Sequence, residues 1–490
     1  MINLTTLQSL APHALLLLAP EVLLAAMAML VLTFGVFRPK SMRSVYRITA
    51  LTLILAIIAL LLPLRLPLGD FTLFNGAIIM DDFARYMKCL ILVAALAAIF
   101  MARDYLERTQ LQRFEYPVLI LLATLGMCLM VSAGDLISMY LALELQGLCL
   151  YVLAAFKRDS LRSSEAGLKY FVLGALSSGI LLFGCSLLYG FAGSTGFEDL
   201  AGAAGTMPEN LGLLFGLVFV LAGLAFKCSA VPFHMWTPDV YEGAPTPVTA
   251  FLAGAAKLAA VALIVRFLAD GFLPAATQWQ QIIIALAVAS MVLGAFAAIG
   301  QKNIKRLMAY SAIGHIGYML AALVTATFEG VAGILLYLAL YLTMNIGIFS
   351  AVLMMQKQDS QVENISEFAG LHERNPLLAF MLAILLFSLA GVPPLAGFFA
   401  KFYVFLAVVE AGLYPLAIIG VLASVVAAFY YLRIVKIMYF DAPAEPIQQT
   451  SGFGLKFLLV VAGVINLAFF AYPAALLIPS QLGAASLIAP

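Results

Sequence analysis

Five side chains that can gain or lose a proton lie inside long apolar stretches of the sequence: Glu144, Lys227, Lys257, His315 and Lys401. An ionisable group deep in a lipid bilayer costs a few kcal/mol or more, so such groups usually face the protein interior and serve transport. Burial favours the neutral form of a lysine, and a nearby carboxylate restores the charged form. A lysine beside a movable carboxylate can therefore take up and release a proton. The set predicts a chain that conducts protons or ions.

Each of these residues also has a simpler interpretation. A buried lysine can form a structural ion pair or extend to the membrane surface, but Lys257 is about eleven residues (roughly 16 Å at the helical rise) from either end of its stretch. A histidine such as His315 is often a hydrogen-bonded core residue. Beside three buried lysines, a proton-relay role for His315 is as well supported as a core role, since neutral imidazole both donates and accepts a hydrogen bond. Ser311 and Tyr318 lie on the same helix face as His315. His234, which follows a proline, fits an interfacial or gating role as well as a relay.

The composition excludes a soluble enzyme. The chain has 490 residues, of which 64% are hydrophobic and 10% charged, with a net charge of +1, whereas soluble domains are about half apolar and a quarter charged. The five cysteines form no CxxC pair and no Cys/His ligand spacing, which leaves iron–sulfur, zinc and disulfide sites unsupported. No GxGxxG follows a strand pattern. We therefore expect no cofactor and no metal in this chain, and any electrons would be carried by another chain.

The elements that position these residues are apolar stretches long enough to cross a bilayer, which takes about 20 residues in a helix. The predicted fold is an all-α polytopic membrane protein with no soluble domain. The first stretch lacks a basic leader and a small-residue cleavage site, so we do not expect a cleaved signal. We count fourteen stretches, at 13–37, 46–64, 84–102, 114–132, 135–156, 166–192, 211–236, 246–268, 279–300, 307–325, 330–355, 377–409, 412–432 and 454–478.

Loop charges give an independent test of this count, because Lys and Arg concentrate on the cytoplasmic side. Of the 26 basic residues, 19 fall on one set of alternate connections, and 3 lie inside spans. The other side has only Arg65, Arg85, Lys88 and Arg266. This bias predicts that both termini lie on the outer side. The inner connections contain Arg38, Lys40, Arg43, Arg47, Arg103, Arg108, Arg113, Lys157, Arg158, Arg162, Lys169, Lys302, Lys305, Arg306, Lys357, Arg374, Arg433, Lys436 and Lys456.

Two of the stretches contain residues that break helices. Pro232 lies in the seventh stretch, and Gly391-Val392-Pro393-Pro394 lies in the twelfth. Proline removes a backbone hydrogen bond, and inside a membrane the freed carbonyl must face protein or water. Each break therefore predicts a polar cavity close to a buried lysine, with an ordinary packing kink as the alternative.

The two broken stretches share a short string. Residues 222–227 (AGLAFK) resemble residues 396–401 (AGFFAK) at an offset of 174. The offset predicts that stretches 4–8 repeat as stretches 9–13, and an odd number of helices makes the repeats inverted, as in many transporters. The expected organisation is a three-helix segment at 1–110, a first inverted five-helix repeat at 111–270, a second at 271–440 and a C-terminal helix at 441–490.

Three segments, at 227–257, 303–315 and 388–402, together resemble the antiporter-like subunits of respiratory complex I, and the similarity spans essentially the whole chain. Among the three large members the N type, known in mitochondria as NADH dehydrogenase subunit 2, is most similar. The chain ends soon after its fourteenth stretch, Lys401 stands where the M type has a glutamate, and residues 237–243 (TPDVYEG) are N-like.

The resemblance implies a role for each residue. Glu144 and Lys227 would form a charged pair whose separation tunes the next site, Lys257 would be the central proton carrier, His315 would link the two halves, and Lys401 would lead outward. Pro232, His234, Pro393 and Pro394 would mark the helix breaks and gating positions. NADH oxidation and quinone reduction, with ubiquinone as the expected quinone, would occur in partner subunits that hold FMN and iron–sulfur clusters. The expected partners are antiporter-like M and small K, J and A type subunits in a bacterial inner membrane.

Three alternatives remain open. A membrane subunit of a multi-chain Na+/H+ antiporter shares the same segments, and neighbouring genes would distinguish it. A structural scaffold would keep proton transport after loss of any one buried charge. A solute carrier would show a saturable substrate and no partners.

Overall fold

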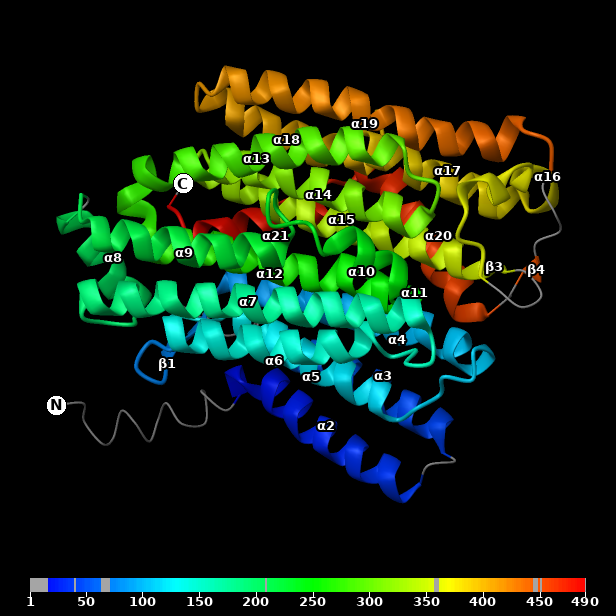
Figure 1. The fold of residues 1–490 in the computed structure, drawn as a ribbon, viewed down its shortest axis with the longest axis horizontal. Helices are drawn as coiled ribbons and strands as arrows, with labels where there is room; N and C mark the ends of the chain where they lie inside the picture. The colour runs from blue at the N-terminus through cyan, green and yellow to red at the C-terminus, as the bar shows by residue number, and fades with distance from the viewer. Residues whose placement is uncertain are drawn as a thin grey trace.

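The computed structural model describes residues 16–38, 41–62, 71–207, 209–356, 361–443, 448–449 and 452–489. Most helices run nearly parallel to one another in a single bundle (Figure 1), which confirms the predicted all-helical membrane class. Lys40, Arg65 and Lys357, which entered the loop-charge count, lie outside the described residues.

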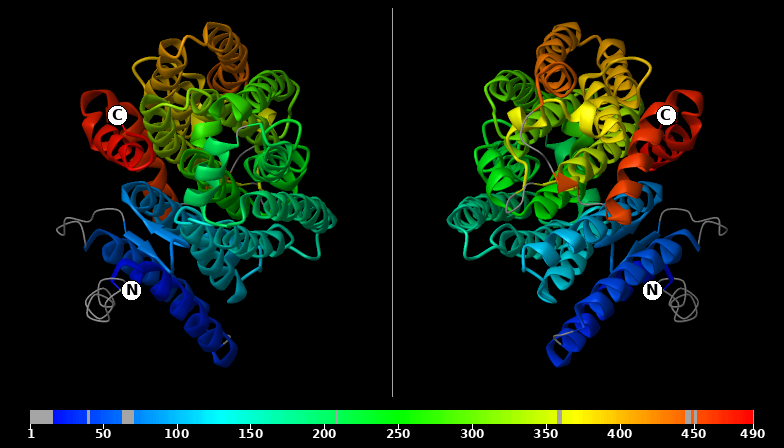
Figure 2. Two further views of the ribbon diagram at one scale, coloured as in Figure 1. Left: turned by 90° about the vertical axis from the view of Figure 1, so that its left-hand side faces the viewer. Right: turned by 90° about the vertical axis from the view of Figure 1, so that its right-hand side faces the viewer.

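The N-terminal part forms one edge of the bundle (Figure 2). An antiparallel hairpin of two short strands precedes its third helix, and Asp81 caps that helix by accepting a hydrogen bond from the Ala84 amide at 2.7 Å. The elements are α2 (Ala19–Phe37), α3 (Met42–Leu61), β1 (Phe71–Leu73), β2 (Ile78–Met80) and α4 (Asp82–Arg108).

The middle of the chain contains a helix that stops inside its apolar stretch and a helix that begins with a π-helical turn. The elements are α5 (Glu115–Met130), α6 (Leu136–Ala154), α7 (Leu161–Ala192), α8 (Phe197–Thr206), α9 (Leu211–Cys228), α10 (Thr237–Gly243), α11 (Thr246–Phe251), the π-helical turn η2 (Leu252–Ala256) and α12 (Lys257–Phe272).

The C-terminal half contains a second interrupted helix. The longer elements are α13 (Ala276–Ile299), α14 (Ile304–Leu323), α15 (Phe328–Met354), α17 (Pro376–Ala390), α18 (Ala396–Glu410), α19 (Tyr414–Phe440), α20 (Phe453–Ala468) and α21 (Ala474–Ala485). The short ones are η3 (Leu273–Ala275), β3 (Met355–Gln356), η4 (Ile365–Phe368), α16 (Leu371–Arg374), β4 (Gln448–Gln449) and η5 (Phe469–Ala471). The β1 strand and α8 lie at one end of the bundle, and β3, β4 and α16 lie at the other (Figure 1).

The helices coincide with the predicted stretches, but two of those stretches are interrupted. The stretch 211–236 is helical only to Cys228, and the stretch 377–409 divides into α17 and α18. By length and apolar composition, the described residues contain ten helical segments able to cross a membrane, one of which joins α11 to α13, and three shorter apolar helices. The chain is thus a polytopic membrane protein, and fourteen crossings remain a prediction.

Three basic residues assigned to loops are buried instead. Lys88 pairs with Glu21 at 2.6 Å, Lys305 with Glu363 at 2.8 Å, and Arg266 with Asp81 at 2.7 Å. All six lie near helix ends, where a loop-charge count treats them as solvent-exposed. A buried charge is tolerated when a partner offsets part of its desolvation cost. The pairs join α4 to α2, α14 to the segment before η4, and α12 to the start of α4.

Candidate functional site

Glu144 and Lys227 lie on neighbouring helices without forming an ion pair. Glu144, on α6, accepts a hydrogen bond from the Ser178 hydroxyl of α7. Lys227, in the last turn of α9, donates to the Tyr151 hydroxyl at 3.3 Å. A Cβ on Gly147, three residues after Glu144, would lie 3.3 Å from the Lys227 ammonium nitrogen. The expected charged pair is therefore close but separated in this structure.

The α9 helix ends before its apolar stretch does. Ser229 adopts a left-handed conformation with φ of 67°, which terminates the helix at Cys228. Eight residues, from Ser229 to Trp236 and including Pro232, separate α9 from α10. A hydrogen bond across the break stabilises it: the Trp236 indole NH donates to the Phe226 carbonyl at 3.0 Å. The freed carbonyl groups face protein, as the sequence predicts.

The side chain of Lys257, the first residue of α12, extends into this break. Its ammonium group donates to the Cys228 carbonyl at 2.8 Å and to the Ser229 hydroxyl. It also lies 5.3 Å from the centre of the Trp236 ring and 5.9 Å from that of Tyr241. A helix C-terminus and aromatic faces both attract a cation. The side chain is only 2% exposed, so these groups replace water around the charge.

A small cavity connects the two lysines of the first half. It has a volume of about 10 Å³ and is bordered by Gln146, Gly147, Leu150, Tyr170, Lys227, Trp236, Leu252, Ala256 and Lys257. A cavity needs roughly 10–15 Å³ to hold one water molecule. The space is polar at both lysine ends, so it suits a single bridging water.

His315 lies in a cluster of hydroxyl groups on the other half of the chain. Its Nδ1 atom is 2.5 Å from the Tyr337 hydroxyl and its Nε2 atom is 3.1 Å from the Tyr431 hydroxyl. Tyr431 also bonds the Ser311 hydroxyl at 2.5 Å, while the Tyr318 ring packs at 5.9 Å from the imidazole. Both ring nitrogens are therefore engaged, and each hydroxyl can donate or accept.

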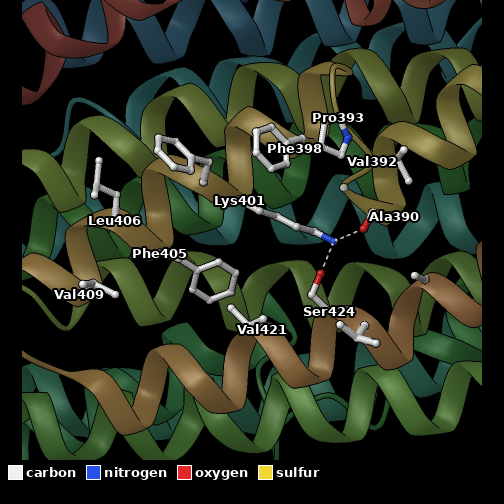
Figure 3. A pocket seen from close by; sticks show the side chains of 14 residues that line it. Ala390, Val392, Pro393, Phe398, Lys401, Phe405, Leu406, Val409, Val421 and Ser424 are labelled. Carbon is white, nitrogen blue, oxygen red and sulfur yellow. Dashed lines mark hydrogen bonds between the residues drawn. The ribbon is translucent and has the colours of Figure 1, made fainter.

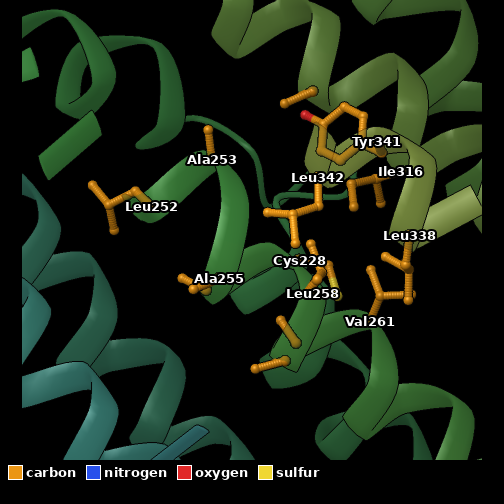
Figure 4. Packing of buried hydrophobic residues seen from close by; sticks show 14 of the residues in the cluster. Cys228, Leu252, Ala253, Ala255, Leu258, Val261, Ile316, Leu338, Tyr341 and Leu342 are labelled. Carbon is orange, nitrogen blue, oxygen red and sulfur yellow. The ribbon is translucent and has the colours of Figure 1, made fainter. Parts of the chain in front are cut away.

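Apolar side chains fill most of the space between the helices of Lys257 and His315. Figure 4 shows Leu258, Val261, Ile316, Leu338 and Leu342 packed together between α12, α14 and α15. Within the part of the chain that the structure describes, no hydrogen bond joins Lys257 to His315. A proton that passes between the halves must cross or bypass this packing.

Lys401 lies in the second broken helix. Its ammonium group donates to the Ala390 carbonyl at 3.0 Å and to the Ser424 hydroxyl at 2.8 Å (Figure 3). It stands 5.2 Å from the centre of the Tyr318 ring, which also touches His315. A groove of about 590 Å³, with mainly apolar walls from α18 and α19, leads to this lysine. His315 and Lys401 are thus brought together through Tyr318.

The two halves hold their lysines in the same way. The final residue of α9 is Cys228 and that of α17 is Ala390, and each is followed by a left-handed residue, Ser229 or Gly391. In both cases the carbonyl of the final helical residue accepts a hydrogen bond from a buried lysine. Each lysine is therefore fixed by the negative end of a helix dipole. No carboxylate lies within 4.0 Å of Lys227, Lys257 or Lys401 among the described residues.

The residues at the breaks are more exposed than the lysines. Pro232, Pro393 and Pro394 are exposed, and His234 is partly buried with an Nδ1 atom that has no partner in the described structure. The similar strings at 222–227 and 396–401 lie on opposite sides of their breaks, since the first precedes its break and the second follows it. The string at an offset of 174 therefore does not set the register of a repeat.

The aromatic and hydroxyl partners of the site are not predicted from the sequence. Tyr151, Trp236, Tyr337, Tyr431 and Ser424 each contact a predicted site residue. Their residue types are common in membrane helices, so only the packing of distant helices reveals them. The one available signal was that both tryptophans and most tyrosines fall within the apolar stretches.

An ionic cluster closes the end of the bundle next to α10. Arg306 pairs with Asp239 at 2.7 Å and Glu242 at 3.0 Å, and Arg162 joins Glu242 to Glu363. Burial of Glu363 raises its pKa, but nearby Lys305, Arg162 and a hydrogen bond from Asn303 more than offset this, so its pKa lies below the usual value. The cluster ties α10, which follows the first break, to α7 and α14.

Comparison with known proteins identifies the family. Residues 133–427 match the family described as NADH:quinone oxidoreductase/Mrp antiporter, TM. NADH-quinone oxidoreductase subunit N of Parvibaculum lavamentivorans is 59% identical over 96% of this chain and 97% of that protein. Subunit N 1 of Rhizobium meliloti is 54% identical, over 91% and 94%. The chain belongs to the NADH-quinone oxidoreductase subunit N family.

Solved membrane complexes contain chains with the same fold. A chain of respiratory complex I from Thermus thermophilus, solved with bound aureothin, is 33% identical with a TM-score of 0.81, over 94% of this chain and 98% of that one. A chain of the Mrp complex from Dietzia has a TM-score of 0.85 over 96% and 97%, but only 21% identity, so it shares the fold alone. The predicted resemblance to the N type is confirmed, and the antiporter is the more distant relative.

Proposed function

We propose that this chain is the proton-translocating membrane subunit N of an NADH-quinone oxidoreductase. The observation that carries the proposal is the set of three lysines held inside apolar helices, two of them by the broken ends of helices. A structural cation would be paired with a carboxylate, whereas these have only neutral partners in the described structure. A lysine with neutral partners can lose its proton without leaving a buried carboxylate unpaired. The set is suited to carrying protons.

The proposed route runs along the membrane midplane. Glu144 biases the charge of Lys227, the water-sized cavity passes a proton between Lys227 and Lys257, and His315 receives it on the other side of the apolar packing. Lys401 then releases it toward the outer side through the Ser424 hydroxyl. Two ammonium groups on one cavity repel each other, so a proton on one lysine favours its loss from the other.

The helix breaks would let this route open and close. Pro232 and His234 lie in the first break, and Pro393 and Pro394 lie in the second. The backbone at both breaks lacks helical hydrogen bonds, so small movements there need not disrupt a helix. A shift of α10 would move Trp236 and Tyr241 relative to Lys257.

The driving reaction would take place elsewhere in the complex. NADH oxidation with FMN and iron–sulfur clusters, and reduction of a quinone such as ubiquinone, would belong to partner subunits. This chain would bind no cofactor, and its contribution would be to move protons in response to changes in charge and shape. The proposed partners are the antiporter-like M and the small K, J and A type subunits in a bacterial inner membrane.

We also propose the finer topology. Fourteen crossings, with both termini on the outer side, would place α8 and β1 outside and α16 inside. The first repeat (111–270) would then match the second (271–440) in inverted orientation, between the three-helix segment 1–110 and the C-terminal helix 441–490. In support, Val231-Pro232 and Val392-Pro393 occupy the two breaks, which gives a repeat register based on the breaks themselves.

Affinity purification tests this function against a multi-chain Na+/H+ antiporter, which shares the fold. A tagged chain should co-purify with NADH-oxidising activity and FMN, and vesicles containing that assembly should take up protons when NADH is supplied. Purification with small membrane proteins alone, together with Na+-dependent proton exchange and no NADH oxidation, would establish the antiporter instead.

A further inference from the structure

The C-terminal helix α20 carries a buried amide side chain that contacts the second broken helix. Asn466 is 0% exposed, and the other buried residues of α20 are Leu455, Leu459, Ala462 and Gly463. The helix packs against α15, α17 and α18. An amide in an apolar interior is costly unless it is hydrogen-bonded, so the partners of Asn466 indicate its role.

The hydrogen bonds of Asn466 fix the direction of its side chain. The amide nitrogen donates to the Ala462 carbonyl of its own helix at 2.9 Å and to the Thr343 hydroxyl of α15 at 3.0 Å. A carbonyl can only accept, so the opposite end of the amide is its oxygen. That oxygen accepts a hydrogen bond from the Ser388 hydroxyl of α17 at 2.8 Å. Asn466 therefore presents an acceptor to α17.

Ser388 also forms a hydrogen bond across the second break. While its hydroxyl donates to Asn466, its oxygen accepts from the Gly397 amide of α18 at 2.9 Å. The first amides of a helix lack partners within that helix, and Leu395, which precedes α18, supplies no side-chain cap. Ser388 thus caps α18 from the last turn of α17. A Cβ on Gly397 would overlap the Ser388 carbonyl oxygen, so the two helix ends are in close contact.

This contact lies next to the groups that hold Lys401. Ser388 is two residues before Ala390, whose carbonyl accepts a hydrogen bond from the Lys401 ammonium group at 3.0 Å (Figure 3). Gly397 is four residues before Lys401, which is about one helical turn. The bond between Ser388 and Gly397 therefore sets how far the Lys401 ammonium group lies from the end of α17.

Asn466 keeps the Ser388 hydroxyl available to α18. A helical serine or threonine commonly donates to the carbonyl four residues earlier in its own helix, as Thr124 does to Ile120 at 2.7 Å. With Asn466 as the acceptor, the hydroxyl hydrogen of Ser388 points to α20 and a lone pair faces Gly397. Loss of this acceptor would let the hydroxyl turn back to its own helix and release the Gly397 amide.

The first break contains a similar hydrogen bond. There the Val231 amide donates to the hydroxyl of Ser290, a fully buried residue of α13, at 2.9 Å. At both breaks a buried serine therefore binds a backbone amide of the interrupted segment. At the second break, Asn466 orients that serine.

We propose that Asn466 is a positioning residue for Lys401, and that it acts through Ser388 to hold the two halves of the second broken helix in register. The inference rests on the proposed function, in which Lys401 releases protons. It adds a role for α20, which lies outside both proposed repeats. Asn466 itself takes up no proton. It keeps the Lys401 ammonium group at the Ala390 carbonyl and the Ser424 hydroxyl, so that proton release starts from one geometry.

Two variants remove this link from opposite ends. Asn466→Leu replaces the amide by an apolar side chain of similar size, and Ser388→Ala removes only the hydroxyl. Asn466→Asp is the conservative variant, since a carboxyl group keeps the oxygen that accepts from Ser388. Leu459→Ala is the structural control, because it opens a cavity in the packing of α20 without removing a hydrogen bond. Ser480→Ala is the matched serine control, since buried Ser480 donates to a carbonyl of its own helix.

The experiment measures NADH-driven proton uptake by inverted membrane vesicles and NADH-quinone turnover in H₂O and D₂O, per assembled complex. We expect Asn466→Leu and Ser388→Ala to lower both activities roughly threefold to tenfold, because a displaced relay group transfers protons slowly. The solvent isotope effect on turnover should rise, since proton release then limits the rate. The double variant should match the slower single variant, because both act through one link. Asn466→Asp should restore most of the activity, and both controls should keep the wild-type isotope effect.

Lys401→Ala, measured beside them, separates two kinds of failure. Full uptake in Lys401→Ala would show that the proposed function of Lys401 is wrong. If Lys401→Ala loses uptake while Asn466→Leu and Ser388→Ala keep the wild-type isotope effect, the positioning role is wrong and the proposed function stands. An equal rise of the isotope effect in Leu459→Ala would also overturn the role, because loosened packing would then explain it. Should Asn466→Leu assemble poorly, Ser388→Ala measured against Ser480→Ala decides by the same criterion.

Discussion

Lys227 and Lys257 border the same cavity of about 10 Å³, although one lies in the last turn of α9 and the other begins α12. The space is close to the minimum for one water molecule. Two cationic groups on one water are coupled, because a charge on either disfavours a charge on the other. The size of this cavity should therefore control how protons pass between the two lysines.

Gly147→Ala tests the importance of that cavity. The added Cβ would lie 3.3 Å from both the Lys227 ammonium nitrogen and the Tyr151 hydroxyl, so the lysine end must shift and the water space shrinks. We expect proton uptake by inverted vesicles to fall several-fold with assembly intact. Gly179→Ala is the control, since its Cβ would meet nothing within 4 Å. Equal uptake in the two variants would show that the cavity does not matter.

The two tryptophans offer a matched pair for the aromatic support of Lys257. Trp236 and Trp279 are both buried, and each donates its indole NH to a backbone carbonyl. Only Trp236 faces an ammonium group, at 5.3 Å. Substitution by Phe should cost each site one hydrogen bond, about 1 kcal/mol, but only Trp236→Phe should lower proton uptake. Thermal inactivation and uptake measured together check this, and a loss of uptake in Trp279→Phe alone would contradict it.

Asp81 and Asp82 are adjacent but should differ strongly in their effect on stability. Asp81 accepts two hydrogen bonds from the fully buried Arg266 at 2.7 and 2.8 Å, while Asp82 pairs with the partly exposed Arg85. Asp81→Asn leaves a buried guanidinium without its full counter-charge and should cost about 3–5 kcal/mol. Asp82→Asn should cost about 1 kcal/mol or less. The midpoint of thermal inactivation measures both, and equal shifts would refute the contrast.

Glu363 should make the α10 end of the bundle sensitive to acid. Its pKa is lowered in the folded protein by Lys305, Arg162 and Asn303, which more than offset its burial. A lowered pKa contributes stability that is present above the unfolded value and is lost as the pH falls through the folded value. Glu363→Gln should therefore be less heat-stable than the wild type at neutral pH, and the difference should vanish in acid. Glu198→Gln, which removes an exposed carboxylate, is the control.

The sequence identifies the charged residues of the site but not the groups that hold them. Lys257 and Lys401 stand out because a charge in an apolar stretch is visible without any structure. Trp236 and Ser424 do not, because their roles arise only when distant helices pack. Lys88 was assigned to a loop because position near a helix end says nothing about burial, which depends here on Glu21 of another helix.

The helical stretches were predicted well because apolar length is a direct requirement of the bilayer. The breaks were placed correctly at Pro232 and Pro393, since proline cannot sustain a helix. The register of the proposed repeat was not placed correctly. The match between residues 222–227 and 396–401 reflects composition near a break, because the first string precedes its break and the second follows its break.

The most direct test of the central claim is proton uptake and NADH-quinone turnover in Lys257→Ala, measured side by side in inverted vesicles with assembly verified. Lys302→Ala, which removes an exposed lysine, is the control. We expect both activities to fall sharply in Lys257→Ala and to remain normal in Lys302→Ala. Full uptake and turnover in assembled Lys257→Ala complex would show that Lys257 is structural and that the buried lysines of this chain do not carry the protons.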